Sequence, residues 1–452
     1  MTVIRSAVLT GLLCGASALA VLQPVHGHSA TLFTDGSRTS IAANESAPPR
    51  GPARVRTWLY YGLNDVNAGV PPEVMARYAD FVEDDGYAAA HAMRFKAAGG
   101  RYAAAYTDPA YVPYCAPPFA PPAGRCKGPI GDVITDESAF FHGRDGTRVR
   151  RFVDPHFQYQ EAINPLSPAA RRAWRDTTAA LVRKAPSLDL FFADDSGGPL
   201  RAGDMSPTSS EFYGFNEAGT EITSDTVFRD AWIAYLTSAV RPVVINGNDP
   251  VTGEPAYDGA FLRAPRVWGA VHEGCFRGGG GLQTDRNDRW RSYADSLLSN
   301  TALHKLAICF MMGTPTPQTR VYALASWWLT YDPEWSVAGP IDAIPDQSAL
   351  LPEIELVPGG PLRTARRIRE LRDPSGAYVR EFRGCFQRGE PIGGCAALVN
   401  PSAREVPVPP VAARYSRALV LGNDDLPHGG RAAWAAPPPR SIAPGSAVIL
   451  AR

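Results

Sequence analysis

From Arg56 onward, short apolar runs alternate along the chain with longer stretches of helical periodicity. The apolar runs span residues 56–62, 101–108, 189–195, 241–248, 267–274 and 305–313. A further strand is expected near residues 161–165, and no eighth run stands out. A repeated order of strand, helix and strand predicts parallel strands that are connected by helical crossovers.

The stretches between these runs carry helix signals. Residues 71–86 begin on proline and end on glycine, which is the usual asymmetry of a helix. Residues 167–186 place Ser167 as the N-cap and Pro168 at the first helical position. Further helices are expected over residues 224–240, 288–304 and 319–331.

Strands and helices in this order over residues 51–373 predict a (β/α)8 barrel, the TIM-barrel fold, whose usual size is around 250 residues plus insertions. A doubly wound open sheet is the alternative, but the chain lacks a glycine-rich phosphate loop after its first strand. Residues 363–373 are expected to complete the barrel as a helix. A small all-β domain, a β-sandwich over residues 374–452 with strands from about Tyr378, is expected to follow.

Polar residues stand at the carboxyl ends of most of the predicted strands, where the reactive side chains of such barrels lie. They are Tyr61, Asn64, Asp65, Tyr106, Asp108, Asn164, Asp194, Asp195, Asn246, Asn248, Asp249, His272 and Glu273. Helix capping accounts for about half of such a set, because Asn and Asp are favoured N-caps.

Asp194 and Glu273 are explained least well by capping. Asp194 ends a run of bulky apolar residues, and Glu273 ends its strand although glutamate is a weak N-cap. Two carboxyl groups that face one cleft are the minimum equipment for glycosidic bond hydrolysis, because one protonates the leaving oxygen and the other attacks or activates water. The alternatives are a plain turn at Asp194 and a salt bridge from Glu273 to Arg277.

Composition narrows the classes of partner. The 45 basic and 45 acidic side chains balance, which argues against electrostatic capture of nucleic acid or of an anionic membrane. Neither a zinc-type Cys/His spacing nor a phosphate-binding loop occurs, so no metal and no cofactor is expected. Aromatic residues near the strand ends suit the apolar faces of sugar rings.

The N-terminus resembles an export signal. Arg5 precedes an apolar stretch from Ala7 to Leu22, so residues 1–30 are expected to be a signal peptide and residues 31–50 a linker. No segment is long and apolar enough for a membrane span, so the expected location is secreted or periplasmic.

Removal of Cys14 with the signal would leave six of the seven cysteines, an even number in an oxidising compartment. Their spacing predicts the disulfides Cys115–Cys126 and Cys385–Cys395, whereas Cys275 and Cys309 could either bond or simply pack.

The segment DLFFADDSGG at residues 189–198 resembles a strand of the bacterial glycoside hydrolases grouped as hypothetical glycosyl hydrolase family 15. INPLSPAARRAW at residues 163–174 resembles the strand-three segment of that family. The C-terminal stretch from Tyr378 is similar to the β domain that closes such enzymes. The resemblance implies a glycosidase whose acids follow strands four and six. Leu190 stands where the family usually has glycine, which leaves Asp194 and Asp195 as alternatives for the first acid.

The chain is therefore expected to be a secreted, monomeric glycoside hydrolase that acts on a polysaccharide or glycan. Asp194 is the expected nucleophile or base, and Glu273 the expected general acid. The residues expected to position sugar hydroxyls are Asp195, Asp108, Asn246, Asn248 and Tyr61. A catalytically inactive carbohydrate-binding barrel is the alternative of a different class, and a lyase or transglycosylase that uses the same acids is the enzymatic one.

Overall fold

A computed structural model describes the protein within the second of its two compact units, residues 49–452. The described residues are 52–59, 71–85, 89–115, 128–131, 133–142, 146–151, 157–196, 214–215, 221–222, 225–246, 260–278, 281–285, 289–312, 316–339, 352–421, 432–435 and 437–452. The expected signal peptide and linker lie outside these residues.

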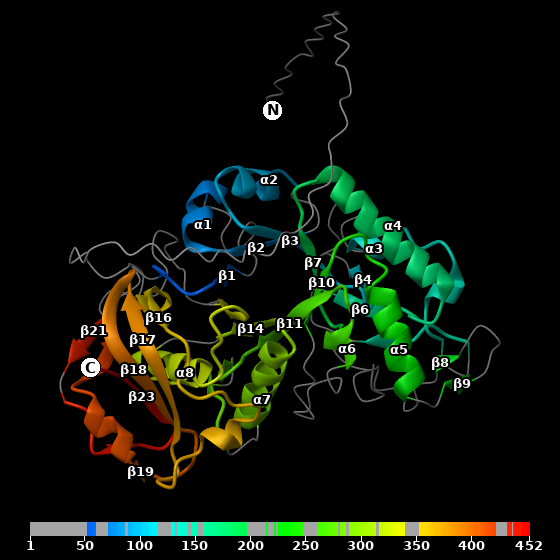
Figure 1. The fold of residues 1–452 in the computed structure, drawn as a ribbon. Coiled ribbons are helices and arrows are strands. Elements are labelled where there is room, and N and C mark those ends of the chain that lie inside the picture. The colour runs from blue at the N-terminus through cyan, green and yellow to red at the C-terminus, as the bar shows by residue number, and fades with distance from the viewer. Residues whose placement is uncertain are drawn as a thin grey trace, which may run out of the picture. The chain divides into compact units, whose positions relative to one another are not determined.

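Eight parallel strands form the barrel, and Figure 1 labels all of them except the last, from β1 in blue to β14 in yellow-green. In spatial order they are β1 (Trp58–Leu59), β2 (Phe81–Asp85), β3 (Tyr102–Thr107), β7 (Leu190–Ala193), β10 (Val243–Asn246), β11 (Val267–Glu273), β14 (Leu306–Phe310) and β15 (Ser336–Gly339). A parallel bridge from Thr57 to Ala338 joins the first strand to the last. The predicted eight-stranded barrel is confirmed, with β7 as its fourth strand and β11 as its sixth.

Helices connect the successive strands of the barrel. They are α1 (Pro72–Tyr78), α2 (Ala89–Ala97), α4 (Pro168–Lys184), α5 (Asp225–Leu236), α6 (Ala260–Arg263), α7 (Arg289–Ala302) and α8 (Pro317–Trp328). Ser167 caps α4 as expected, because its side chain accepts a hydrogen bond from the amide of Ala169.

The second and eighth strands were not predicted. Residues 71–86 were expected to be one helix, but α1 ends at Tyr78 and β2 begins at Phe81. The acidic residues of β2 gave it the pattern of an exposed helix, so the strand was not predicted. Glu83 is nevertheless fully buried and accepts a hydrogen bond from the indole of Trp58 at 3.1 Å. The eighth strand is short and ends on Gly339, where a Cβ would lie 1.9 Å from the Phe310 ring.

The strand expected near residues 161–165 is not part of the barrel. It corresponds to β6 (Phe157–Ala162), which pairs antiparallel with β4 (Tyr111–Cys115) and β5 (Arg150–Arg151). This small sheet, with α3 (Gly128–Gly131) and the 3-10 turn η2 (Glu137–Ala139), lies in sequence between β3 and α4. INPLSPAARRAW therefore follows an inserted sheet, and Tyr102–Thr107 is the third barrel strand.

The barrel interior is aromatic. Side chains alternate between the two faces of a strand, so Leu190 and Phe192 of β7 point inward, while Phe191 packs with the outer helices. Phe192 packs against Phe310, with ring centroids 6.4 Å apart, and against Trp58 at 6.1 Å. These rings fill the interior of the barrel. The side chains at the carboxyl ends of the strands therefore lie directly above a packed core.

A six-stranded antiparallel sheet follows the barrel and confirms the expected all-β domain, while its description as a β-sandwich stays a prediction. Its order is β16 (Leu356–Pro358), β17 (Tyr378–Gln387), β18 (Glu390–Asn400), β23 (Ser446–Ala451), β20 (Arg417–Leu421) and β21 (Ala432–Ala435). Side chains of β18 alternate as predicted, because Ala397 and Val399 join the cluster around Trp328 of α8 while Leu398 joins a second cluster.

The border of this sheet lies earlier than expected. β16 already pairs with β17, so the C-terminal sheet begins at Leu356. Residues 363–373 were expected to be helical but contain one 3-10 turn, η6 (Ile368–Leu371). The other short elements are η5 (Pro352–Glu355), η7 (Pro410–Arg414) and the strand pairs β8–β9 (Gly214–Phe215, Glu221–Ile222), β12–β13 (Arg277–Gly278, Gly281–Leu282) and β19–β22 (Val406–Pro407, Ser441–Ile442).

Two disulfides occur among the described residues. Cys385–Cys395 joins β17 to β18 and confirms a predicted pair. Cys275–Cys309 resolves the alternative that the sequence left open, because the two residues are bonded with their Cα atoms 5.5 Å apart. The predicted Cys115–Cys126 pair involves residue 126, which lies outside the described residues. Within the described part of the chain, no helix has the length and apolar character needed to cross a membrane.

Candidate active site

Four consecutive barrel strands bring polar side chains to one mouth of the barrel. Tyr106 ends β3, Asp194 follows β7, Asn246 ends β10 and Glu273 ends β11. Each is an even number of residues from an inward-facing side chain of its strand, such as Phe192 before Asp194, so all four belong to the inner face. All four are half-buried.

The Asp194 carboxylate accepts three hydrogen bonds. The Tyr106 hydroxyl donates to Oδ2 at 2.5 Å, and Nδ2 of Asn246 donates to Oδ1 at 2.6 Å. The amide of Asp195 donates to Oδ1 at 2.8 Å. Because all three partners donate, they fix the orientation of the carboxylate and match its ionised form, which only accepts.

Glu273 lies in an environment that favours its neutral form. Burial, with a further contribution from the negative charges of Asp194 and Asp195, raises the pKa of Glu273 from 4.5 to about 7. A hydrogen bond from Asn246 acts in the opposite direction and lowers this pKa. Asn246, on the strand between the two acids, therefore interacts with both carboxyl groups.

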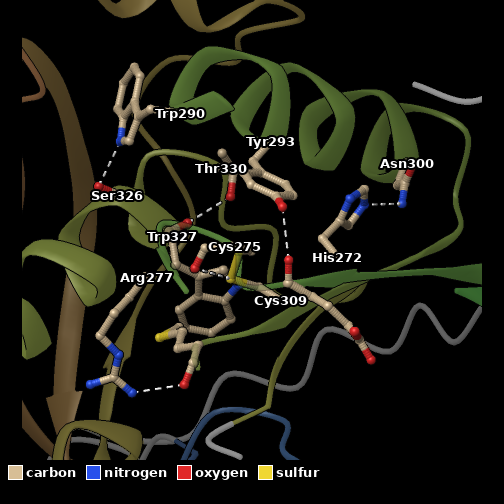
Figure 2. Close-up of a disulfide and its surroundings, with 12 residues drawn as sticks. His272, Cys275, Arg277, Trp290, Tyr293, Asn300, Cys309, Ser326, Trp327 and Thr330 are labelled. Carbon is tan, nitrogen blue, oxygen red and sulfur yellow. Dashed lines mark hydrogen bonds between the residues drawn. A yellow bond between two sulfur atoms is a disulfide. The ribbon is translucent and has the colours of Figure 1, made fainter. Parts of the chain in front are cut away.

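The turn after Glu273 is held at several points. Gly274 has a φ of 65°, the left-handed conformation that favours glycine. The Cys275 amide donates to the Phe310 carbonyl at 3.1 Å, and the Cys275–Cys309 disulfide links the turn to β14. Figure 2 shows this disulfide and the hydroxyl of Tyr293, which donates to the Glu273 carbonyl at 2.9 Å. These contacts fix the backbone that carries the Glu273 carboxyl group.

His272, the residue before Glu273, faces away from the barrel interior. It is buried, and burial lowers its pKa to about 3, so the ring is neutral. Its Nε2 shares a hydrogen bond of 3.1 Å with the side-chain amide of Asn300 on α7 (Figure 2). His272 therefore anchors β11 to α7 behind the site.

The turn after Asp194 is also held by backbone hydrogen bonds. The Asp194 amide donates to the Thr107 carbonyl at 2.8 Å, and Asp195 adopts a left-handed φ of 49°. The Ser196 amide donates to the Asn246 carbonyl at 3.1 Å. A non-glycine residue with positive φ is uncommon, and Asn and Asp are the types that tolerate it best. Asp195 is half-buried, and its charge acts on Glu273.

Arg277 was the alternative partner for Glu273. Its guanidinium donates to the carbonyl oxygens of Met311 and Met312, each at 2.8 Å, and Figure 2 draws one of these bonds. These bonds tie the residues after β11 to those after β14.

The other candidate residues have different placements. The Asp108 carboxylate accepts hydrogen bonds from the amides of Ala110 at 3.0 Å and Tyr111 at 3.1 Å, so it stabilises the turn after β3. Asn248 and Tyr61 lie outside the described residues. Among the described residues, no group of His, Cys, Asp and Glu is arranged to hold a metal ion.

Sequence reasoning gave Tyr106 no contact with the acids. The sequence did not show that β3 and β7 are neighbouring strands. In the structure Tyr106 pairs with Phe192, and its hydroxyl reaches Asp194, which lies two residues after Phe192. The order of strands in a closed barrel, combined with the two-residue alternation, would have placed Tyr106 beside Asp194.

A scan of known protein families finds no match to this chain, so the resemblance to hypothetical glycosyl hydrolase family 15 stays a prediction. No curated protein matches the chain either.

Solved structures similar to this chain include Amy13B of Eubacterium rectale, with 8% identity over 90% of this chain and 97% of that one and a TM-score of 0.44. The isomaltulose synthase of Klebsiella shares 10% identity over 88% and 98% of the two chains, with a TM-score of 0.43. Ega3 of Aspergillus fumigatus, solved with galactosamine, shares 16% identity over 57% and 77%, with a TM-score of 0.30. At these scores, the assignment of the fold rests on the chain's own strand pairing.

Proposed function

We propose that the protein is a glycoside hydrolase that cleaves O-glycosidic bonds of a polysaccharide or glycan, with Glu273 as general acid and Asp194 as nucleophile. The observation that carries the proposal is the pairing of two carboxyl groups in opposite environments at one barrel mouth. Asp194 accepts three hydrogen bonds, while burial and neighbouring charge raise the pKa of Glu273 to about 7. Environments that separate two carboxyl groups in this way assign one as acid and the other as nucleophile or base.

Glu273 has the properties of a general acid. With a pKa of about 7, a large fraction of Glu273 keeps its proton at neutral pH, and this proton can pass to the departing glycosidic oxygen. The contacts of the following turn with Phe310 and Cys309 hold the backbone in place during the transfer.

Asp194 has the properties of a nucleophile. The hydroxyl of Tyr106 and the amide of Asn246 orient the carboxylate, and a lone pair of Oδ2 can attack an anomeric carbon. We propose that Asp195 and Asn246 bind sugar hydroxyls beside it, and that Asp108 supports the turn that follows Tyr106.

We infer retention of anomeric configuration. Oxygens that accept hydrogen bonds from the same amide nitrogen lie within about 6 Å of each other. Asn246 interacts with both carboxyl groups, which favours the spacing of about 5 to 5.5 Å of retaining enzymes over the about 6.5 to 9.5 Å of inverting ones. The anomer formed first, measured by proton NMR, distinguishes the two stereochemical outcomes.

Export fits this function. The apolar N-terminal stretch and two disulfides support a secreted or periplasmic enzyme, because disulfides persist in oxidising compartments.

The test is a hydrolysis screen over polysaccharides and glycans with the wild type, Glu273→Gln and the control Glu390→Gln, whose side chain is exposed in the C-terminal sheet. The proposal predicts release of reducing ends by the wild type and the control, and a loss of about a hundredfold or more in Glu273→Gln. A wild type that binds glycans without cleaving any of them would favour a carbohydrate-binding barrel instead.

A further inference from the structure

A pocket of about 500 Å³ lies apart from the two candidate acids, beside the start of α4. Its apolar lining includes the half-buried Leu166, the exposed Pro168 and the buried Phe140 and Phe141, and its polar lining includes His142, Asn164 and Arg172. This volume and this mixture of apolar surface with a few polar groups are typical of small-molecule sites.

The pocket is built by the insertion that follows the third barrel strand. The Ile163 amide donates to the Ala110 carbonyl, and the Asn164 amide donates to the Ala139 carbonyl at 2.8 Å. Ala110 is in turn held by Asp108, two residues beyond Tyr106. The pocket therefore belongs to the loop region that leaves the same barrel mouth as the candidate acids.

One wall of the pocket is held by ion pairs and by a cation–π contact. Arg148 lies over the Phe140 ring, 3.8 Å from its centroid, and its guanidinium bonds the buried Glu161 and the more exposed Glu137. Glu137 also binds Nε2 of His142 at 2.8 Å. These contacts hold Phe140 and His142, so little ordering entropy remains to be lost on binding.

The charges at the pocket select the ligand. Arg172 is exposed and lines the pocket, and no Asp or Glu is among the described residues that line it. Outside this lining, Asp136 accepts hydrogen bonds from Ser138 and its charge also interacts with Arg172, while Glu137 holds His142 and Arg148. A guanidinium recognises a carboxylate with two parallel hydrogen bonds, while the apolar lining formed by Leu166 and Pro168 suits the face of a sugar ring.

We propose that this pocket is an accessory subsite for a carboxylate-bearing sugar of the glycan, an inference that rests on the proposed function for its link to catalysis but not for binding itself. Arg172 binds the carboxylate, the side-chain amide of Asn164 donates to a ring substituent, and Leu166 and Pro168 contact the apolar side of the ring.

Binding is measured by calorimetry on the full-length Glu273→Gln variant, so that hydrolysis plays no part. The probes are polygalacturonate, hyaluronan and alginate as carboxylated polymers, dextran and galactan as neutral ones, and inorganic sulfate at matched ionic strength. We expect at least one carboxylated polymer to bind more tightly than both neutral polymers, and Arg172→Ala to weaken it by about tenfold or more. The affinity of Arg172→Lys should lie between those of the protein with Arg172 and of Arg172→Ala, because lysine keeps the charge without the planar guanidinium.

The matched control is Arg175→Ala, an exposed arginine one turn further along α4 that is not part of the pocket. Equal losses in the Arg172 and Arg175 variants would overturn the proposal in favour of general charge attraction. Equal binding of all polymers, or competition by sulfate alone at the same concentration, would overturn it as well. Absence of hydrolysis by the wild type with Arg172-dependent binding retained would refute the proposed function and leave the subsite intact.

Discussion

At the scale of single residues, the candidate site depends on two carboxyl groups that lie in different environments. Donors surround Asp194, whereas burial and the charges of Asp194 and Asp195 raise the pKa of Glu273. Removing a neighbouring negative charge lowers the pKa of a buried acid.

Replacing Asp195 by Asn should therefore lower the pKa of Glu273 and move the alkaline limb of the kcat/KM profile to lower pH. Activity should fall most near pH 7 and least near pH 5, because more Glu273 is then ionised at neutral pH. Asp189→Asn, at the opposite end of the same strand, should leave the limb in place. An unchanged limb in Asp195→Asn would show that Asp195 does not act on the catalytic acid.

The ionised form of Glu273 should also lower the stability of the folded state. Its folded pKa of about 7 exceeds the ordinary 4.5, so the folded state holds the proton more tightly and stability falls as pH rises between these values. Glu273→Gln is neutral at every pH, so it should match the wild type near pH 4 and exceed it by roughly 3 kcal/mol at pH 8. Denaturant unfolding at both pH values measures the difference, and an equal effect at both would contradict it.

At the scale of elements, the apolar runs predicted six of the eight barrel strands, and the strand-end pattern predicted both candidate acids. β2 was missed because its acids mimic a helix surface, although Glu83 points inward to the Trp58 indole. β15 was missed because it is a short strand that ends on Gly339, where a Cβ would lie 1.9 Å from the Phe310 ring. β6 was misassigned because antiparallel and parallel buried strands share one apolar pattern, and only tertiary pairing separates them.

The two disulfides should differ in what their removal changes. Cys275–Cys309 bridges 34 residues and adjoins the turn after Glu273, so replacing both cysteines by alanine should lower stability by about 3 to 4 kcal/mol and reduce kcat. Cys385–Cys395 closes a separation of 10 residues in the C-terminal sheet, so the same replacement should cost about 3 kcal/mol and leave kcat unchanged. Unfolding curves and kinetics on both variants test this, and equal effects on kcat would contradict the assigned role of the first bond.

At the scale of the whole molecule, α8 contacts the segment that leads into the C-terminal sheet. Arg320 of α8 is fully buried and pairs through two hydrogen bonds with Glu353 of η5, one of them 2.6 Å long. Trp328 of the same helix contributes to a core shared with Phe382 of β17. The sequence indicated two domains but not this shared core, because a pattern of apolar residues does not reveal which surfaces meet.

Glu353→Gln should lower the free energy of unfolding by about 3 to 5 kcal/mol, because the buried guanidinium loses its counter-charge. Glu355→Gln, two residues away, removes the partner of the exposed Arg388 and should cost less than about 1 kcal/mol. Similar costs for the two variants would contradict the importance assigned to the buried pair.

The most direct test of the central claim compares two substrates of the sugar that the hydrolysis screen identifies. One is the natural glycan, and the other is an aryl glycoside with a good leaving group, which needs little help from a general acid. The account predicts that Asp194→Asn loses about a thousandfold or more on both substrates, whereas Glu273→Gln loses a comparable factor on the glycan and little on the aryl glycoside. Near wild-type hydrolysis by Asp194→Asn, or equal losses on both substrates in Glu273→Gln, would contradict the assignment of Asp194 as nucleophile and Glu273 as acid.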